Sequence, residues 1–76
     1  MRGSSLQARR ANWFARFPLC VACEKLGRVS AALELDHVIP LWEGGPDADS
    51  NLQGLCIPCH AAKTAAELRR RYGKSQ

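Results

Sequence analysis

Apolar residues near the start of the chain repeat at the spacing of an α-helix. Leu6, Trp13 and Phe17 fall on one helical stripe, and Pro18 ends the segment. This pattern predicts a helix over residues 6–17. We expect its aromatic side chains to belong to the core, because aromatic rings bury large apolar areas; stacking on nucleic-acid bases is the less favoured alternative.

Two short strands are predicted in the middle of the chain. Within the segment 29–39, apolar and polar residues alternate in the first part of the run 33–39, which predicts a strand, and a second short strand is expected over residues 51–55. The residues between them, 40–50, contain Gly44-Gly45-Pro46 and two aspartates, a composition typical of an irregular loop.

A second long helix is predicted from about Pro58 to Tyr72. Proline is tolerated in the first turn of a helix, and Gly73 supplies a stop signal. At helical spacing, the stripe expected to be buried consists of Ala61, Ala65, Leu68 and Tyr72. The opposite stripe carries His60, Lys63, Glu67 and Arg70.

The length and composition indicate one small globular domain. The chain has 76 residues, and a domain of this size buries only about 60% of its unfolded surface, so extra staples usually stabilise it. Its residues are 46% apolar and 24% charged, which excludes a disordered chain. No apolar run approaches the ~20 residues of a membrane span, and residues 1–19 lack the apolar core of a signal peptide. We therefore expect a cytoplasmic protein.

The net charge of +4 conceals a strong segregation of charge along the chain. Residues 1–23 contain four arginines and no acid, and residues 29–62 contain five acids and no Lys or Arg. Residues 63–76 contain five basic residues and a single acid, Glu67. Two basic flanks around an acidic centre favour a polyanionic partner held at the edges and a cation in the middle. Solvated helix faces explain the same charge runs equally well.

Four cysteines form two Cys-x-x-Cys knuckles, Cys20/Cys23 and Cys56/Cys59. Disulfides and a redox dithiol are the alternatives, but a cytoplasmic location disfavours the first, and the second does not need two knuckles. A tetrahedral zinc site explains both knuckles at once. Four thiolates leave no position for water, so such a site is structural.

The segment between and beside the knuckles carries a second group of ligand-type residues: Asp36, His37, Asn51 and His60. Each residue alone is ordinary. Together, one carboxylate and one imidazole can hold a second, open metal site, and His37 beside it can serve as a base, since histidine ionises near neutral pH. Neighbours on a regular strand point to opposite faces, so Asp36 and His37 share one site only if the strand distorts before Pro40.

The chain resembles the HNH endonucleases over residues 18–64. The matching segments are, in order, Cys20-x-x-Cys23, Leu35-Asp36-His37-Val38-Ile39-Pro40-Leu41, Gly44-Gly45, Asp49-Ser50-Asn51-Leu52-Gln53 and Leu55-Cys56-x-x-Cys59-His60-x-x-Lys63-Thr64. The resemblance implies a small α+β fold: a ββα-metal core with a structural four-cysteine zinc site and an N-terminal helix. The implied organisation is a basic helix over 1–17, the nuclease domain over 18–72 and a tail over 73–76.

The resemblance also implies roles for the residues of the second group. Asp36 and His60 are the ligands of a catalytic divalent ion, His37 is the general base, and Asn51 orients His37 by holding the long loop. The second ligand-like histidine of colicin-type members is absent, with Thr64 in its place. The identity of the metal therefore stays open among Mg²⁺, Mn²⁺, Ni²⁺ and Zn²⁺.

The implied activity is metal-dependent hydrolysis of DNA phosphodiester bonds, leaving a 5′-phosphate and a 3′-hydroxyl. Small phage and prophage HNH nucleases are the most similar members, and some work beside the DNA-packaging terminase, so terminase is a second implied partner in a bacterial or phage-infected cell. A zinc-stabilised DNA-binding or adaptor module without catalysis is the alternative. The residues expected to hold DNA phosphates, with little sequence preference, are Lys63, Arg69, Arg70, Arg71, Arg9, Arg10 and Arg16.

Overall fold

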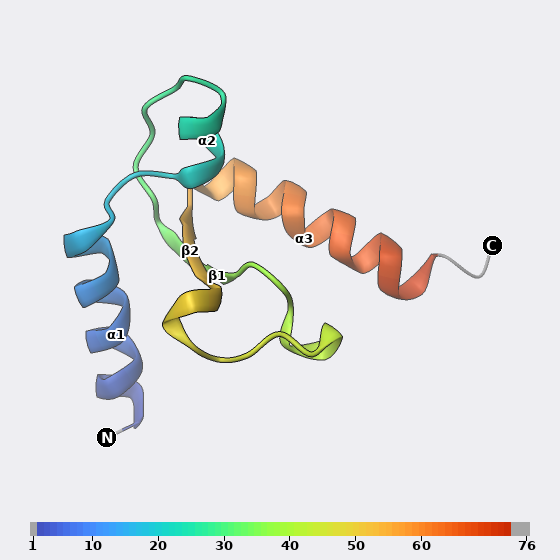
Figure 1. Cartoon of the computed structure of the whole chain (residues 1–76), viewed down its shortest axis with the longest axis horizontal. Coiled ribbons are helices and arrows are strands. Elements are labelled where there is room, and N and C mark those ends of the chain that lie inside the picture. Colours follow the sequence, from blue (N-terminus) through green and yellow to red (C-terminus); the bar gives the residue numbers. More distant parts are fainter. Residues whose placement is uncertain (1, 74–76) are drawn as a thin grey trace.

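The computed structural model describes residues 2–73. Two long helices diverge on either side of a β-hairpin, and a long loop joins the two strands (Figure 1). The elements in chain order are α1 (Arg2–Arg16), α2 (Val21–Lys25), β1 (Glu34–His37), 3₁₀ turns at Leu41–Glu43 and Asp49–Asn51, β2 (Leu52–Leu55) and α3 (Ile57–Tyr72). Of the predicted tail, only Gly73 belongs to the described residues.

The hairpin is antiparallel, and its register runs from Glu34 opposite Leu55 to His37 opposite Leu52. β1 lies in the alternating run of the first predicted segment, and β2 begins one residue later than predicted. Leu52 and Leu55 are buried on β2. With α3 following β2 directly, the two strands and the helix form the ββα arrangement of a small α+β fold.

Helix α1 packs on the hairpin through its aromatic residues. Trp13 and Phe14 are half-buried, and a Cβ atom built on Gly54 of β2 would lie 3.4 Å from the Phe14 ring. The close neighbour of that position is Ala32 Cβ, at 2.8 Å, so the missing side chain of Gly54 makes room for Ala32, and α1 lies at ordinary contact distance from the strand. The predicted core role fits these two rings, whereas Phe17 is 45% exposed. The side chain of Leu6 lies outside the described part.

The face of α3 that packs on the hairpin is opposite to the face that was predicted to be buried. The expected buried stripe is exposed, with Leu68 at 48% and Tyr72 at 66% exposure. The polar stripe of His60, Lys63 and Glu67 is half-buried instead. The reason lies in β1, which presents the carboxylate of Asp36 to the helix, and a carboxylate is matched by polar partners rather than by alanine.

The core is small and is built around the thiols. Cys20, Cys23, Leu55 and Cys56 form a buried cluster, and residues of α2 pack against it. The described chain is flat, with extents of 42 × 35 × 18 Å. Within residues 2–73, neither long helix combines the length and the apolar composition that crossing a membrane requires.

Candidate active site

The four cysteines meet where α2 and α3 begin. Their sulfur atoms all lie within 4.8 Å of one another, and Cys23 Sγ is 3.8 Å from both Cys56 Sγ and Cys59 Sγ. Sulfurs at about 2.3 Å from one tetrahedral ion are about 3.8 Å apart, so the geometry fits a shared metal ion. None of the four is in a disulfide. This cluster therefore can hold a metal ion.

The thiols of this cluster also differ in pKa. Burial raises the pKa of the Cys20 thiol, but hydrogen bonds from the backbone N–H groups of Cys56 and Cys23 outweigh it and lower the pKa to about 6. Hydrogen bonds with the thiols of Cys56 and Cys23 raise the pKa of Cys59 to about 12. A thiolate at Cys20 near neutral pH favours capture of a cation.

A second cluster lies between β1 and α3 and contains Asp36, His60, Lys63 and Gln53. Asp36 is only 10% exposed, and its Oδ1 lies 3.7 Å from His60 Nε2. Its Oδ2 accepts hydrogen bonds from Lys63 Nζ at 3.0 Å and from Gln53 Nε2 at 2.9 Å. Oxygen and nitrogen ligands at about 2.1 Å from one ion can be separated by such a distance. The structure thus brings together the carboxylate and the imidazole expected to bind the catalytic ion.

His37 lies on the other side of the strand. The ladder is regular through His37 and the chain bends only after it, at residues 38–39, so Asp36 and His37 face opposite sides of β1. His37 Nε2 lies 2.9 Å from Asp47 Oδ1, to which Arg9 donates at 3.1 Å. These hydrogen bonds, from His37 first and then Arg9, lower the pKa of the Asp47 carboxyl.

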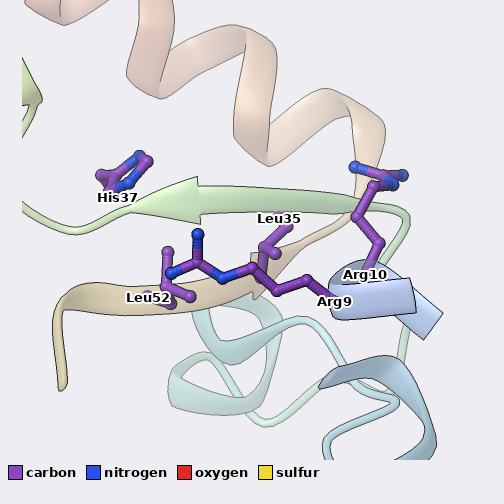
Figure 2. Close-up of a pocket in the computed structure, with 5 residues that line it drawn as sticks. All are labelled: Arg9, Arg10, Leu35, His37 and Leu52. Atoms are coloured by element: carbon purple, nitrogen blue, oxygen red, sulfur yellow. The ribbon is translucent and has the colours of Figure 1, made fainter. Parts of the chain in front are cut away.

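The side chain of His37 borders a pocket between α1 and the hairpin. The pocket encloses about 230 Å³. Its lining residues are Arg9, Arg10, Leu35, His37 and Leu52, and Figure 2 shows the Arg9 side chain extended along the hairpin past Leu52, whereas the Arg10 side chain points away from the two leucines. Arg9 and His37 at this pocket share the carboxylate of Asp47.

Asn51 fixes the loop that follows His37. It is 5% exposed, its Oδ1 accepts from Ile39 N at 2.9 Å, and its Nδ2 donates to the carbonyl oxygens of Ile39 and Pro46, each at 2.9 Å. Gly45 sits against this arrangement, where a Cβ atom would be 1.9 Å from Ile39 O. The backbone just after His37 is therefore held by one amide side chain.

Several of the predicted DNA-contacting residues are already paired with acids. Arg70 binds Glu43 at 2.7 Å, and Arg9 also lies 3.8 Å from Asp49. Lys63 is bonded to Asp36, to His37 O at 2.9 Å and to Glu67. Within residues 2–73, the arginines for which no ion pair to an acidic side chain is found include Arg10, Arg16, Arg69 and Arg71.

Three polar residues around the site were not identified as site residues from the sequence. Gln53 lies opposite Asp36 in the hairpin register, so the register alone would have identified it. Glu67 follows Lys63 by one helical turn, which is a detectable spacing for an ion pair. Asp47 lies in the irregular loop, and no periodicity pointed to its contact with His37.

Comparisons with known proteins identify the family through a sequence model and a solved structure. A sequence model of the HNH endonuclease family matches residues 20–66. The mouse (Mus musculus) protein "DNA annealing helicase and endonuclease ZRANB3" is 36% identical over 64 residues, which cover 80% of this chain and 6% of that protein. The crystal structure of the HNH endonuclease of the deep-sea thermophilic bacteriophage GVE2, determined with a manganese ion, is 33% identical with a TM-score of 0.62. That match covers 92% of this chain and 91% of the phage chain.

Proposed function

Since the chain belongs to the HNH endonuclease family and is therefore a nuclease, we propose that it hydrolyses DNA with one divalent ion held by Asp36 and His60. The observation that carries this proposal is the approach of the Asp36 carboxylate to the His60 imidazole, 3.7 Å apart across the β1–α3 interface. Both relatives support it, because one is a DNA annealing helicase and endonuclease and the other is an HNH endonuclease whose structure was determined with manganese.

Asp36 and His60 fit a divalent ion because a largely buried carboxylate oxygen lies 3.7 Å from the Nε2 atom of a partly exposed imidazole, which leaves one side of the pair open to solvent. When bound there, Mg²⁺, Mn²⁺, Ni²⁺ or Zn²⁺ would polarise the scissile phosphate and stabilise charge on the leaving 3′ oxygen. Gln53 donates to Asp36 at 2.9 Å and so orients the carboxylate toward α3. Zinc is the proposed ion of the four-cysteine cluster, where it ties α2 to α3.

His37 is the proposed general base. Asp47 accepts the hydrogen bond from Nε2–H, which leaves the lone pair of Nδ1 free to take a proton from water. His37 is the last residue of β1, so a phosphate at this end of the strand can contact both faces of the hairpin. Asn51 keeps this end in place by holding the backbone of Ile39. The proposed products carry a 5′-phosphate and a 3′-hydroxyl.

DNA binding is assigned to the arginines at the two edges of the molecule. Arg69, Arg70 and Arg71 are exposed at the end of α3, and Arg9, Arg10 and Arg16 lie on α1. We leave Lys63 out of this set because its ammonium already has three acceptors. Contacts to phosphates alone give affinity with little sequence preference. Residues 18–72 are the proposed nuclease domain, and residues 1–17 are the proposed basic N-terminal helix that precedes it.

The similarity to a phage HNH endonuclease supports a proposed role in phage DNA processing. A place beside terminase in a bacterial or phage-infected cell is part of the same proposal. The competing function is a zinc-stabilised DNA-binding or terminase-adaptor module. It leaves the Asp36–His60 pair without a purpose, whereas a nuclease uses both residues.

Plasmid cleavage across the four divalent metals tests the proposal. We expect His37→Ala to lower cleavage by at least ~10²-fold while zinc content, ion binding and DNA binding persist, because a base is lost and no ligand. Asp36→Ala and His60→Ala should also abolish cleavage, but with weakened binding of the second ion. Glu24→Gln, on the exposed surface of α2, is the control. Parental cleavage by His37→Ala would contradict the assignment of the base, and absence of cleavage with every metal would favour the adaptor.

A further inference from the structure

The ammonium group of Lys63 lies between two carboxylates at the proposed ion site. It is 3.0 Å from Asp36 Oδ2 on β1 and pairs with Glu67 one turn along α3. Its remaining hydrogen bond goes to His37 O at 2.9 Å. An ammonium has three donors, so all of them are used here.

This group of charges is largely withdrawn from water. The side chains of Asp36, Glu67 and Lys63 are 10%, 15% and 23% exposed. Charges in such a place interact more strongly than at the surface, because the surrounding dielectric is lower. One ammonium and two carboxylates carry a net charge of −1, so the site retains attraction for a cation.

Lys63 and a divalent ion must compete for the same carboxylate. The ammonium occupies Asp36 Oδ2, and its positive charge repels any cation placed between Asp36 and His60. Glu67 offers the ammonium a second anion on its own helix. In the described part of the chain, Lys63 is the single ion-pair partner of Glu67, so this carboxylate is committed to the lysine.

We infer that Glu67 is a positioning residue that retains the Lys63 ammonium and thereby sets the affinity of the Asp36–His60 site for divalent ions. This inference rests on the proposed function of that site. With Glu67 present, the ammonium can give up Asp36 Oδ2 to the ion and keep its bonds to Glu67 and His37 O. Without the Glu67 charge, Asp36 is the remaining anion for Lys63, and the ion is excluded.

A double-mutant cycle in Mn²⁺ affinity tests this inference. Calorimetric titration of Mn²⁺ into the zinc-loaded protein would compare the parent, Glu67→Gln, Lys63→Met and the double variant. We expect Glu67→Gln to weaken binding about tenfold and Lys63→Met to bind at least as tightly as the parent. In the Lys63→Met background, Glu67→Gln should weaken binding clearly less than in the parent, because only the direct attraction between Glu67 and the ion is left to lose.

Any other result overturns the inference. Unchanged affinity in Glu67→Gln would remove Glu67 from the site, and an equal weakening in the parent and in the Lys63→Met background would make Glu67 act on the ion itself. If the parent binds no Mn²⁺, or if Asp36→Asn leaves Mn²⁺ binding unchanged, the proposed function fails as well. This outcome differs from a failure of the Glu67 inference alone, in which Mn²⁺ still binds at Asp36. Zinc content and circular dichroism confirm that each variant is folded, and Glu24→Gln controls for the loss of one acid.

Discussion

At the scale of single residues, the loop after His37 depends on an amide and on a missing side chain. Asn51 makes three hydrogen bonds to the backbone of Ile39 and Pro46, and Gly45 fits against Ile39 O with no room for a Cβ atom. Gly44 before it adopts φ = 89°, a left-handed conformation that favours glycine. Both glycines of this pair are thus required, for different reasons.

Gly45→Ala should destabilise the protein by about 2–4 kcal/mol, since the new methyl group displaces Ile39 O or Asn51 Nδ2. Gly27→Ala is the matched control: Gly27 has φ = 77° but nothing within 4 Å of its Cβ position, so about 1 kcal/mol of backbone strain is expected. Urea denaturation measures both values. Equal losses in the two variants would contradict the steric argument.

At the scale of elements, the sequence predicted the positions of helices and strands along the chain better than it predicted which face of each element is buried. The helix expected over 58–72 is α3, Ile57–Tyr72, and the strand expected over 51–55 is β2, Leu52–Leu55. Spacing could not identify the buried face of α3, because the choice depends on Asp36, a residue distant in sequence. Likewise α2 is too short to leave a periodic signal.

The site divides in the same way between what was predictable and what was not. The expected meeting of Asp36 with His60 came from the resemblance to a family, and the geometry brings these side chains together. The contact of Asp47 with His37 depends on how an irregular loop folds, which local sequence does not determine. The roles of all these residues stay predictions.

Removal of the structural metal should unfold the domain rather than merely inactivate it. The cysteine cluster supplies most of the buried core, and structural zinc sites contribute about 10–16 kcal/mol in zinc-finger peptides. We expect about one zinc per chain and loss of helical circular dichroism on chelation. Because metal-binding thiols must be deprotonated, zinc release should grow as the pH falls through about 6, the pKa of Cys20. A folded, metal-free protein with both knuckles oxidised would contradict this.

At the scale of the whole molecule, the basic flanks and the acidic centre touch each other. α1 and α3 diverge on either side of the loop (Figure 1), and Arg9 and Arg70 each reach back to acids of that loop. The acidic centre thus holds both basic edges in place through exposed ion pairs. Such pairs contribute little stability in water, so DNA phosphates can replace the loop carboxylates at small cost.

Replacing Arg69, Arg70 and Arg71 by Ala should weaken binding to all DNA sequences alike. Each lost phosphate contact should flatten the slope of log affinity against log salt by about 0.9 on duplex DNA. Fluorescence anisotropy at several salt concentrations measures the slope, with Arg28→Ala, on the exposed turn after α2, as the control. An unchanged slope in the triple variant would move the DNA contact to the arginines of α1.

The stacking of guanidinium groups on Trp42 gives the protein an internal optical reporter. Arg70 and Arg71 lie 6.0 and 5.2 Å from the centre of that indole, which is 42% exposed. The second tryptophan, Trp13, is at the far edge, with its Nε1 buried against the hairpin. Withdrawal of the guanidinium groups toward a phosphate changes the surroundings of Trp42 alone. In a Trp13→Phe background, emission would therefore follow engagement of the α3 edge in real time, without a label on protein or DNA.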